Sequence, residues 1–178
     1  MTDPAADLFG EPALIKGEDK ERYMRLFAMV EADMKPKTFL DRMMVQEQTN
    51  KIWEEQRLRS NAAALTEGAF PEALEILLRP FCDITTGTSS AIARNYYSGD
   101  SKTKEGAASF LAKCGITTAQ IQAKAMQINS GGHQTIDRMI NNRENSRRGL
   151  RKEFERRSAV NDNAPARVSD EPEEGTES

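Results

Sequence analysis

Residues 38–68, TFLDRMMVQEQTNKIWEEQRLRSNAAALTEG, contain no proline and no interior glycine, and they predict one long helix. Thr38 and Asp41 have the N-cap and N3 spacing of an acidic capping box, which marks the start of that helix. At about 1.5 Å per residue, such a helix is about 43 Å long. Its apolar side is marked by Leu40, Met44, Ile52, Trp53 and Leu65.

The composition of the 178 residues favours helix throughout, because straight-chain helix formers are abundant while valine, isoleucine and tyrosine are sparse. No long run alternates apolar and polar residues as a strand does. We expect a mainly α fold, an irregular bundle of two long helices and several short ones. The expected limits are a loosely ordered segment at 1–16, one helical domain at 17–158 and a disordered acidic tail at 159–178.

The other helices are predicted from local start and stop signals. Pro36 ends a first helix, and Pro71 has the N1 position of a short one. Gly115 has the place of a left-handed cap, after which Thr117 and Gln120 form a second capping box. The expected helices cover about 17–34, 71–79, 89–97, 101–114, 118–128 and 133–158. We expect the two long helices, about 38–66 and 133–157, to lie beside each other, with the shorter helices over one end.

Charge is distributed unevenly along the chain. From Asn161 onward there are six acids and one base, which leaves 24 bases and 22 acids in residues 1–160. The N-terminal residues lack the basic and apolar regions of a signal peptide, and no apolar run approaches the ~18 residues of a membrane span. We therefore expect a cytoplasmic protein without a membrane partner.

The residues that usually carry chemistry are few and scattered. Cys82 and Cys114 have no metal-ligand spacing, and we expect two buried free thiols. His133, the single histidine, follows two glycines and has the position of a helix-start residue. No phosphate-binding glycine motif is present. We expect no enzymatic activity, no cofactor, no metal site and no small-molecule ligand.

Two stretches resemble a known group of proteins when they are taken together. The first is GEDKERYMRLFAMVEADMKPKTFLDRMMVQEQTNKIWEEQRLRS at 17–60, and the second is IDRMINNRENSRRGLRKEFERR at 136–157. Both resemble an uncharacterised family of small helical alphaproteobacterial proteins, often encoded near phage or transposon genes. The resemblance implies a helical fold and a mobile-element context, with no known activity or site residues. The chain departs from the pattern at Gly131–Gly132 and at Gly149, which leaves the continuity of the last helix open.

The basic stretch at 138–157 has two interpretations. Residues spaced alternately by four and three positions form a heptad-like seam: Ile136, Ile140, Arg143, Arg147, Leu150, Phe154 and Arg157. Arg148, Lys152 and Arg156 follow a neighbouring face. The first interpretation is a packed helix whose arginines pair with carboxylates. The second is a nucleic-acid-binding helix whose phosphate contacts come from Arg143, Arg147, Arg148, Arg151 and Lys152.

Two further possibilities remain open at this level. Residues 110–126, FLAKCGITTAQIQAKAM, partly match a helix-turn-helix, in which Thr118, Gln120, Gln122 and Lys124 would face the groove. The weak amphipathicity of the long helix favours a second copy as partner, with anchors at Met43, Met44, Ile52 and Trp53. We therefore expect a non-enzymatic helical protein of mobile-element context that binds nucleic acid through its basic C-terminal helix. The alternative is a homodimerising scaffold or a protein-interaction module without nucleic-acid binding.

Overall fold

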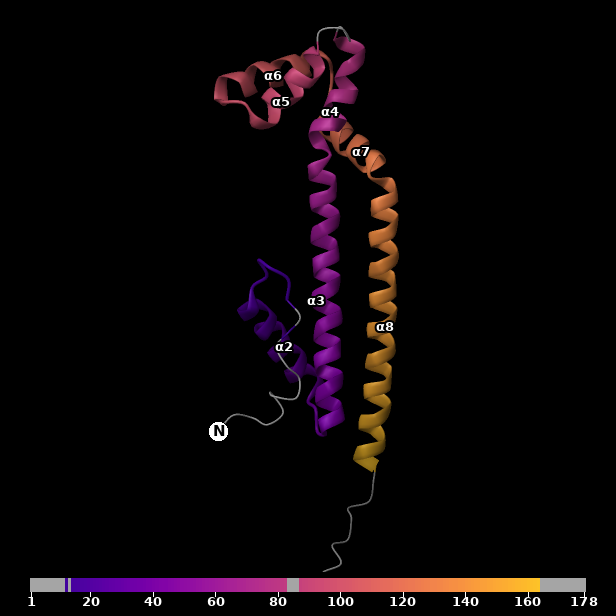
Figure 1. Ribbon diagram of the computed structural model, residues 1–178. Helices are drawn as coiled ribbons and strands as arrows, with labels where there is room; N and C mark the ends of the chain where they lie inside the picture. Colours follow the sequence, from indigo (N-terminus) through magenta and orange to yellow (C-terminus); the bar gives the residue numbers. More distant parts are fainter. Residues whose placement is uncertain (1–11, 13, 83–86, 164–178) are drawn as a thin grey trace, which may run out of the picture. The chain divides into compact units, whose positions relative to one another are not determined.

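The computed structural model describes residues 12, 14–82 and 87–163, and every regular element in these ranges is a helix (Figure 1). The mainly α prediction is therefore confirmed. Most of the segment 1–16 and residues 164–178 of the predicted tail lie outside these ranges. The elements are α2 (Lys20–Met34), α3 (Phe39–Gly68), α4 (Phe70–Leu78), η1 (Arg79–Phe81), α5 (Thr88–Ser98), α6 (Ser101–Lys113), α7 (Thr118–Ile128) and α8 (Ser130–Asn163).

The chain divides into two compact units. Unit 1 combines the residues up to Thr49 with those from Ser146 onward, and unit 2 comprises residues 50–145. The single helical domain expected over 17–158 is thus resolved into two packing units. Helices α3 and α8 contribute residues to both units, because each helix extends past the boundary between unit 1 and unit 2.

Unit 1 packs α2 with the beginning of α3 and the end of α8 (Figure 1). Tyr23, Met44, Val45 and Phe154 are its buried apolar residues, and burial raises the pKa of the Tyr23 hydroxyl. Asp19 caps α2 by accepting hydrogen bonds from two backbone amides of the first turn, at 2.8 and 3.1 Å. All three helices thus contribute buried apolar residues to unit 1.

The predicted acidic capping box at the start of α3 is confirmed. The Thr38 amide donates to Asp41 Oδ2 at 2.9 Å, and the Asp41 amide donates to Thr38 Oγ1 at 3.2 Å. Burial alone would raise the pKa of the Asp41 carboxyl. Hydrogen bonds from Thr38 and Lys37, together with the charge of Arg157, bring it below its ordinary value. The carboxylate therefore links the start of α3 electrostatically to the end of α8.

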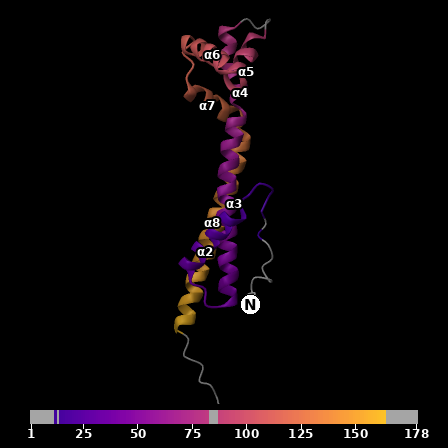
Figure 2. The same cartoon turned by 90° about the vertical axis from the view of Figure 1, so that its left-hand side faces the viewer.

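Unit 2 contains a core of small and aliphatic residues around α4. Helix α4 packs against α5 and α7, and α5 packs against α6 (Figure 2). Pro71 occupies the first turn of α4, as its fixed backbone angle predicts. The core consists of Ala69, Ala73, Leu74, Leu78, Ala93, Leu111, Ile121 and Ala125.

Helix α8 begins close to the end of α3 within unit 2. The Asn129 side chain donates to the Leu65 carbonyl at 2.8 Å. A Cβ at Gly132 would come within 2.7 Å of Leu65 Cδ2, so glycine permits this approach. The chain bends at Asn129 rather than at the glycines, and α8 then continues through Gly149 to Asn163. Residues 159–163 are consequently helical and do not belong to the tail.

Trp53 provides a test of the packing of α3, because only 8% of its surface is exposed. We expect Trp53→Ala to reduce the free energy of unfolding by about 3–5 kcal/mol, since the indole leaves a cavity that its neighbours fill incompletely. Urea denaturation followed by circular dichroism measures this change. Met43→Ala is the control, because Met43 is 45% exposed and its loss should cost less than about 0.5 kcal/mol. Equal midpoints for the two variants would contradict the burial of Trp53.

The lowered pKa of Asp41 predicts that part of the folding stability is lost at acid pH. Its pKa is lowered in the folded protein, so its contribution to stability is present above the unfolded-state pKa of about 3.9 and is lost as the pH falls through the folded value. We expect the stability difference between the wild type and Asp41→Asn to shrink as the pH falls from about 6 to about 3. Denaturation at a series of pH values measures the difference. A difference independent of pH would mean that Asp41 contributes through shape and not through charge.

Candidate nucleic-acid interface on helix α8

One face of α8 is less exposed than the rest, and it follows alternate steps of three and four residues. Phe154 is buried and the other members are half-buried. They are the residues predicted for the seam: Ile136, Ile140, Arg143, Arg147, Leu150, Phe154 and Arg157. The helix therefore turns two of the five candidate phosphate-binding residues, Arg143 and Arg147, toward its packed side.

In unit 2 the seam of α8 is held to α3 by charged groups. Arg143 Nε lies 2.8 Å from Glu54 Oε2. Arg59 donates to two carboxylates, Glu55 at 2.8 Å and Glu144 at 3.0 Å. The Glu55 hydrogen bond and the two negative charges raise the pKa of Arg59. Arg143 is thus engaged within the protein.

In unit 1 the other candidates lie on exposed parts of α8. Arg148 and Lys152 are one turn apart and both are exposed, with exposed Gly149 between them. A Cβ at Gly149 would meet no other atom within 4 Å. Residues 146–160 carry six basic and two acidic side chains, so this part of the helix is clearly cationic. We call the set Arg148, Gly149, Lys152 and Arg156 the outward face.

Carboxylates lie beside Arg151 and Arg156. Arg151 lies 3.1 Å from Glu155 of its own helix and 3.6 Å from Asp33 of α2. Arg156 donates to Glu153 at 2.7 Å, and this hydrogen bond lowers the pKa of Glu153 and raises that of Arg156. Exposed pairs of this kind contribute little to stability and exchange readily with solvent. They reduce the positive charge of α8 without cancelling it.

The region that partly matches a helix-turn-helix lies in unit 2. The Ile116 amide donates to the Leu111 carbonyl at 3.0 Å around left-handed Gly115, which confirms the predicted glycine cap. Thr117 and Gln120 form the predicted capping box, which engages the Gln120 side chain. Thr118 and Gln122 are exposed, while Lys124 is half-buried and donates to Gln127 at 3.0 Å. Helix α7 packs on α4, whereas α6 packs on α5. This arrangement favours a plain helical hairpin.

The residues proposed as dimer anchors differ in how exposed they are. Met44 and Trp53 are buried in the chain itself and Ile52 is half-buried, so Met43 is the one exposed member of that set. Phe39 and Leu40 are also exposed, by 52% and 41%. Phe39, Leu40 and Met43 are therefore the exposed large apolar residues of the first turns of α3.

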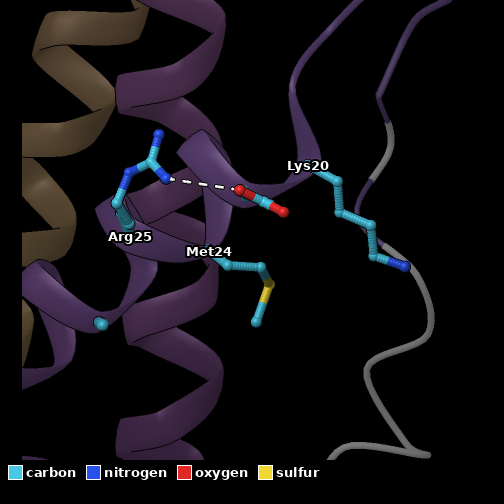
Figure 3. A pocket seen from close by; sticks show the side chains of 5 residues that line it. Lys20, Met24 and Arg25 are labelled. Carbon is cyan, nitrogen blue, oxygen red and sulfur yellow. Dashed lines mark ion pairs between the residues drawn. The ribbon is translucent and has the colours of Figure 1, made fainter.

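A shallow depression on α2 is lined by residues of that helix alone (Figure 3). They are Lys20, Glu21, Met24, Arg25 and Ala28. Arg25 lies 3.8 Å from Glu21 and 3.8 Å from Asp19, so two carboxylates of the chain itself are already near its guanidinium group. A ligand site usually gathers polar groups from several elements, and this depression does not.

The single histidine lies between two helices of unit 2. His133 Nε2 lies 3.0 Å from Thr66 Oγ1, which itself donates to the Ala62 carbonyl at 3.1 Å, so the histidine ties the first turns of α8 to α3. Cys82 and Cys114 are half-buried free thiols, and burial raises the pKa of Cys82. Among the described residues, no group of three or more histidine, cysteine, aspartate or glutamate side chains could hold a metal ion. No helix in the described ranges is both long and apolar enough to cross a bilayer.

No family model, no curated protein and no solved structure matches this chain.

The two sets of basic residues on α8 should respond differently to substitution. We expect Arg143→Gln with Arg147→Gln to lower the free energy of unfolding by about 1 kcal/mol or more, because it removes the Glu54 ion pair from a half-buried seam. Arg148→Gln with Lys152→Gln should change it by less than about 0.5 kcal/mol, because both side chains are exposed. Urea denaturation of both double variants measures the difference. Equal effects would mean that the spacing does not separate packed from outward residues.

Proposed function

We propose that the protein binds the phosphate backbone of nucleic acid through the outward face of α8. The observation that carries the proposal is an exposed pair of cations, Arg148 and Lys152, one turn apart and next to an unobstructed Gly149. Lysine and arginine side chains on one helix face can follow a line of phosphates, and the binding releases counterions. The earlier set of five candidates is thereby revised. Arg148 and Lys152 are its centre, Arg151 and Arg156 flank them, and Arg143 and Arg147 serve packing.

Gly149 supports this assignment because no packing contact within the chain requires a glycine at this position. A glycine inside a helix costs about 0.5–1 kcal/mol relative to alanine. At Gly132 the side chain of Leu65 explains the glycine, but no atom lies within 4 Å of a Cβ at position 149. An exposed glycine next to two cations permits close approach of another molecule's backbone. Backbone and side-chain contacts to phosphate carry no base information, so we propose binding without sequence preference.

A second candidate function is a homodimerising scaffold, and one observation favours it. Phe39, Leu40 and Met43 lie together at the start of α3 and are exposed. Exposed apolar groups that gather on one surface are typical of protein interfaces. This candidate requires self-association without nucleic-acid binding.

Binding at the outward face predicts a steep salt dependence. We expect the affinity for a short labelled DNA duplex to fall with salt, with a log–log slope of about −0.9 per phosphate contact. Arg148→Gln with Lys152→Gln should make the slope shallower by about 1.8. Fluorescence anisotropy at several salt concentrations measures both values. Lys102→Gln with Lys104→Gln is the matched control, because it removes two exposed cations from α6 and should leave the slope unchanged.

Gly149→Ala separates binding from folding in the same assay. We expect it to stabilise the protein by about 0.5–1 kcal/mol and at the same time to weaken binding, because the new methyl group occupies the approach to the helix. Gly106→Ala in α6 is the control: Gly106 is also exposed and without contacts, so this variant should gain stability at unchanged affinity.

The absence of salt-dependent binding to duplex or single-stranded DNA or RNA would reject the proposal. In that case sedimentation velocity decides on the scaffold. A dimer that Met43→Lys dissociates would support it, and a monomer would reject the scaffold as well.

A further inference from the structure

The acidic residues beyond the described end of α8 complement the outward face in charge. Residues 164–178 contain five acids and one base, whereas the outward face contains three bases and no acid. We propose that the C-terminal segment 164–178 binds back on the outward face of α8 and competes there with nucleic acid. The competition with nucleic acid rests on the proposed function, whereas the contact between the C-terminal segment and the outward face does not.

Distances along the chain permit this contact. At about 1.5 Å per residue, Lys152 lies about 17 Å and Arg148 about 22 Å before Asn163 along the helix axis. An extended chain advances about 3.3 Å per residue, so the acids at 170–174 reach back about 23–36 Å from Asn163. The reach of every one of these acids exceeds the axial distance to Arg148 and Lys152, so the acids can contact both residues without any movement of α8.

The chemistry of the segment suits a competitor better than a structural element. Its acids are Asp170, Glu171, Glu173, Glu174 and Glu177, and it contains no aromatic residue. Carboxylates and phosphates are both oxygen anions that accept hydrogen bonds from arginine and lysine. A short tether holds them at an effective concentration of about 1 mM, which compensates for weak individual contacts. Such contacts are screened within about 8 Å at physiological salt, so the effect should be strongest at low ionic strength.

A zero-length carbodiimide cross-linker tests the binding back without nucleic acid, because it joins a carboxylate to an amine in direct contact. In the full chain at low salt, we expect mass spectrometry to find Lys152 joined to Glu171, Glu173 or Glu174. These links should disappear at about 1 M salt, where the screening length is about 3 Å. Lys102, an exposed lysine of α6, is the control and should give few links to the segment. Mixing ¹⁴N- and ¹⁵N-labelled protein distinguishes links within one chain from links between copies.

Affinity measurements test the competition. A chain that ends at Asn163 should bind a short DNA duplex about threefold to tenfold more tightly at low salt, and the gain should shrink as salt rises. The full-length variant D170N/E171Q/E173Q/E174Q/E177Q should reproduce this gain, since it removes charge and keeps length. Both proteins should retain the melting temperature of the wild type.

The possible failures are distinct. If the wild type binds duplex while links to Lys152 are missing and truncation has no effect, the inference is overturned and the proposed function stands. If Lys152 is cross-linked to the segment but neither truncation nor charge removal changes the affinity for DNA, the competition is overturned. If the cross-links form only between two copies of the protein, the intramolecular contact is overturned. If no form of the protein binds nucleic acid but the links form, the proposed function fails and the binding back is supported.

Discussion

The steps of three and four residues along α8 determine most of what the helix can do. They turn Leu150 and Phe154 inward and leave Arg148 and Lys152 on the exposed side. A helix places residues three and four apart on one face, so the spacing alone separates packed from outward arginines. The same sequence therefore serves as a packing surface and as a cationic surface.

The packed side of α8 is unusual because charged residues occupy several of its positions. In unit 2, Arg143 pairs with Glu54, and Arg59 holds Glu144 of α8. A half-buried charge is tolerated when a partner and hydrogen bonds offset its lost hydration. Such pairs add less stability than apolar contacts, but they disfavour other registers, because a shift of one residue would separate the charges. We regard the alignment of α8 along α3 within unit 2 as the main contribution of these ion pairs to the fold.

Much of the helical structure follows from local signals. The capping boxes at Thr38 and Thr117, Pro71 in the first turn of α4 and the cap at Gly115 were all predictable, because each depends on a few neighbouring residues. The division of α8 into a seam and an outward face was predictable from spacing.

The burial pattern of α3 was less accessible from the sequence. Polar Gln48, Thr49 and Lys51 are buried as well as apolar Met44 and Val45, and their burial weakens the apolar periodicity of α3. Local pattern could therefore not separate buried Met44 from exposed Met43. The carboxylate partners of the α8 arginines are also far away in the sequence, so only the three-dimensional arrangement reveals them.

The composition of unit 1 has a consequence for how the chain is made. Its parts come from opposite ends of the described sequence, with all of unit 2 between them. A ribosome releases the N-terminal part first, and local contacts form before distant ones. Helices α4, α5 and α6 can associate while α8 is still being synthesised, whereas unit 1, to which buried Tyr23 and Val45 belong, is incomplete until residues 146–163 have emerged. Synthesis that stalls after α7 thus leaves the apolar surface of α2 and α3 open to chaperones or to aggregation.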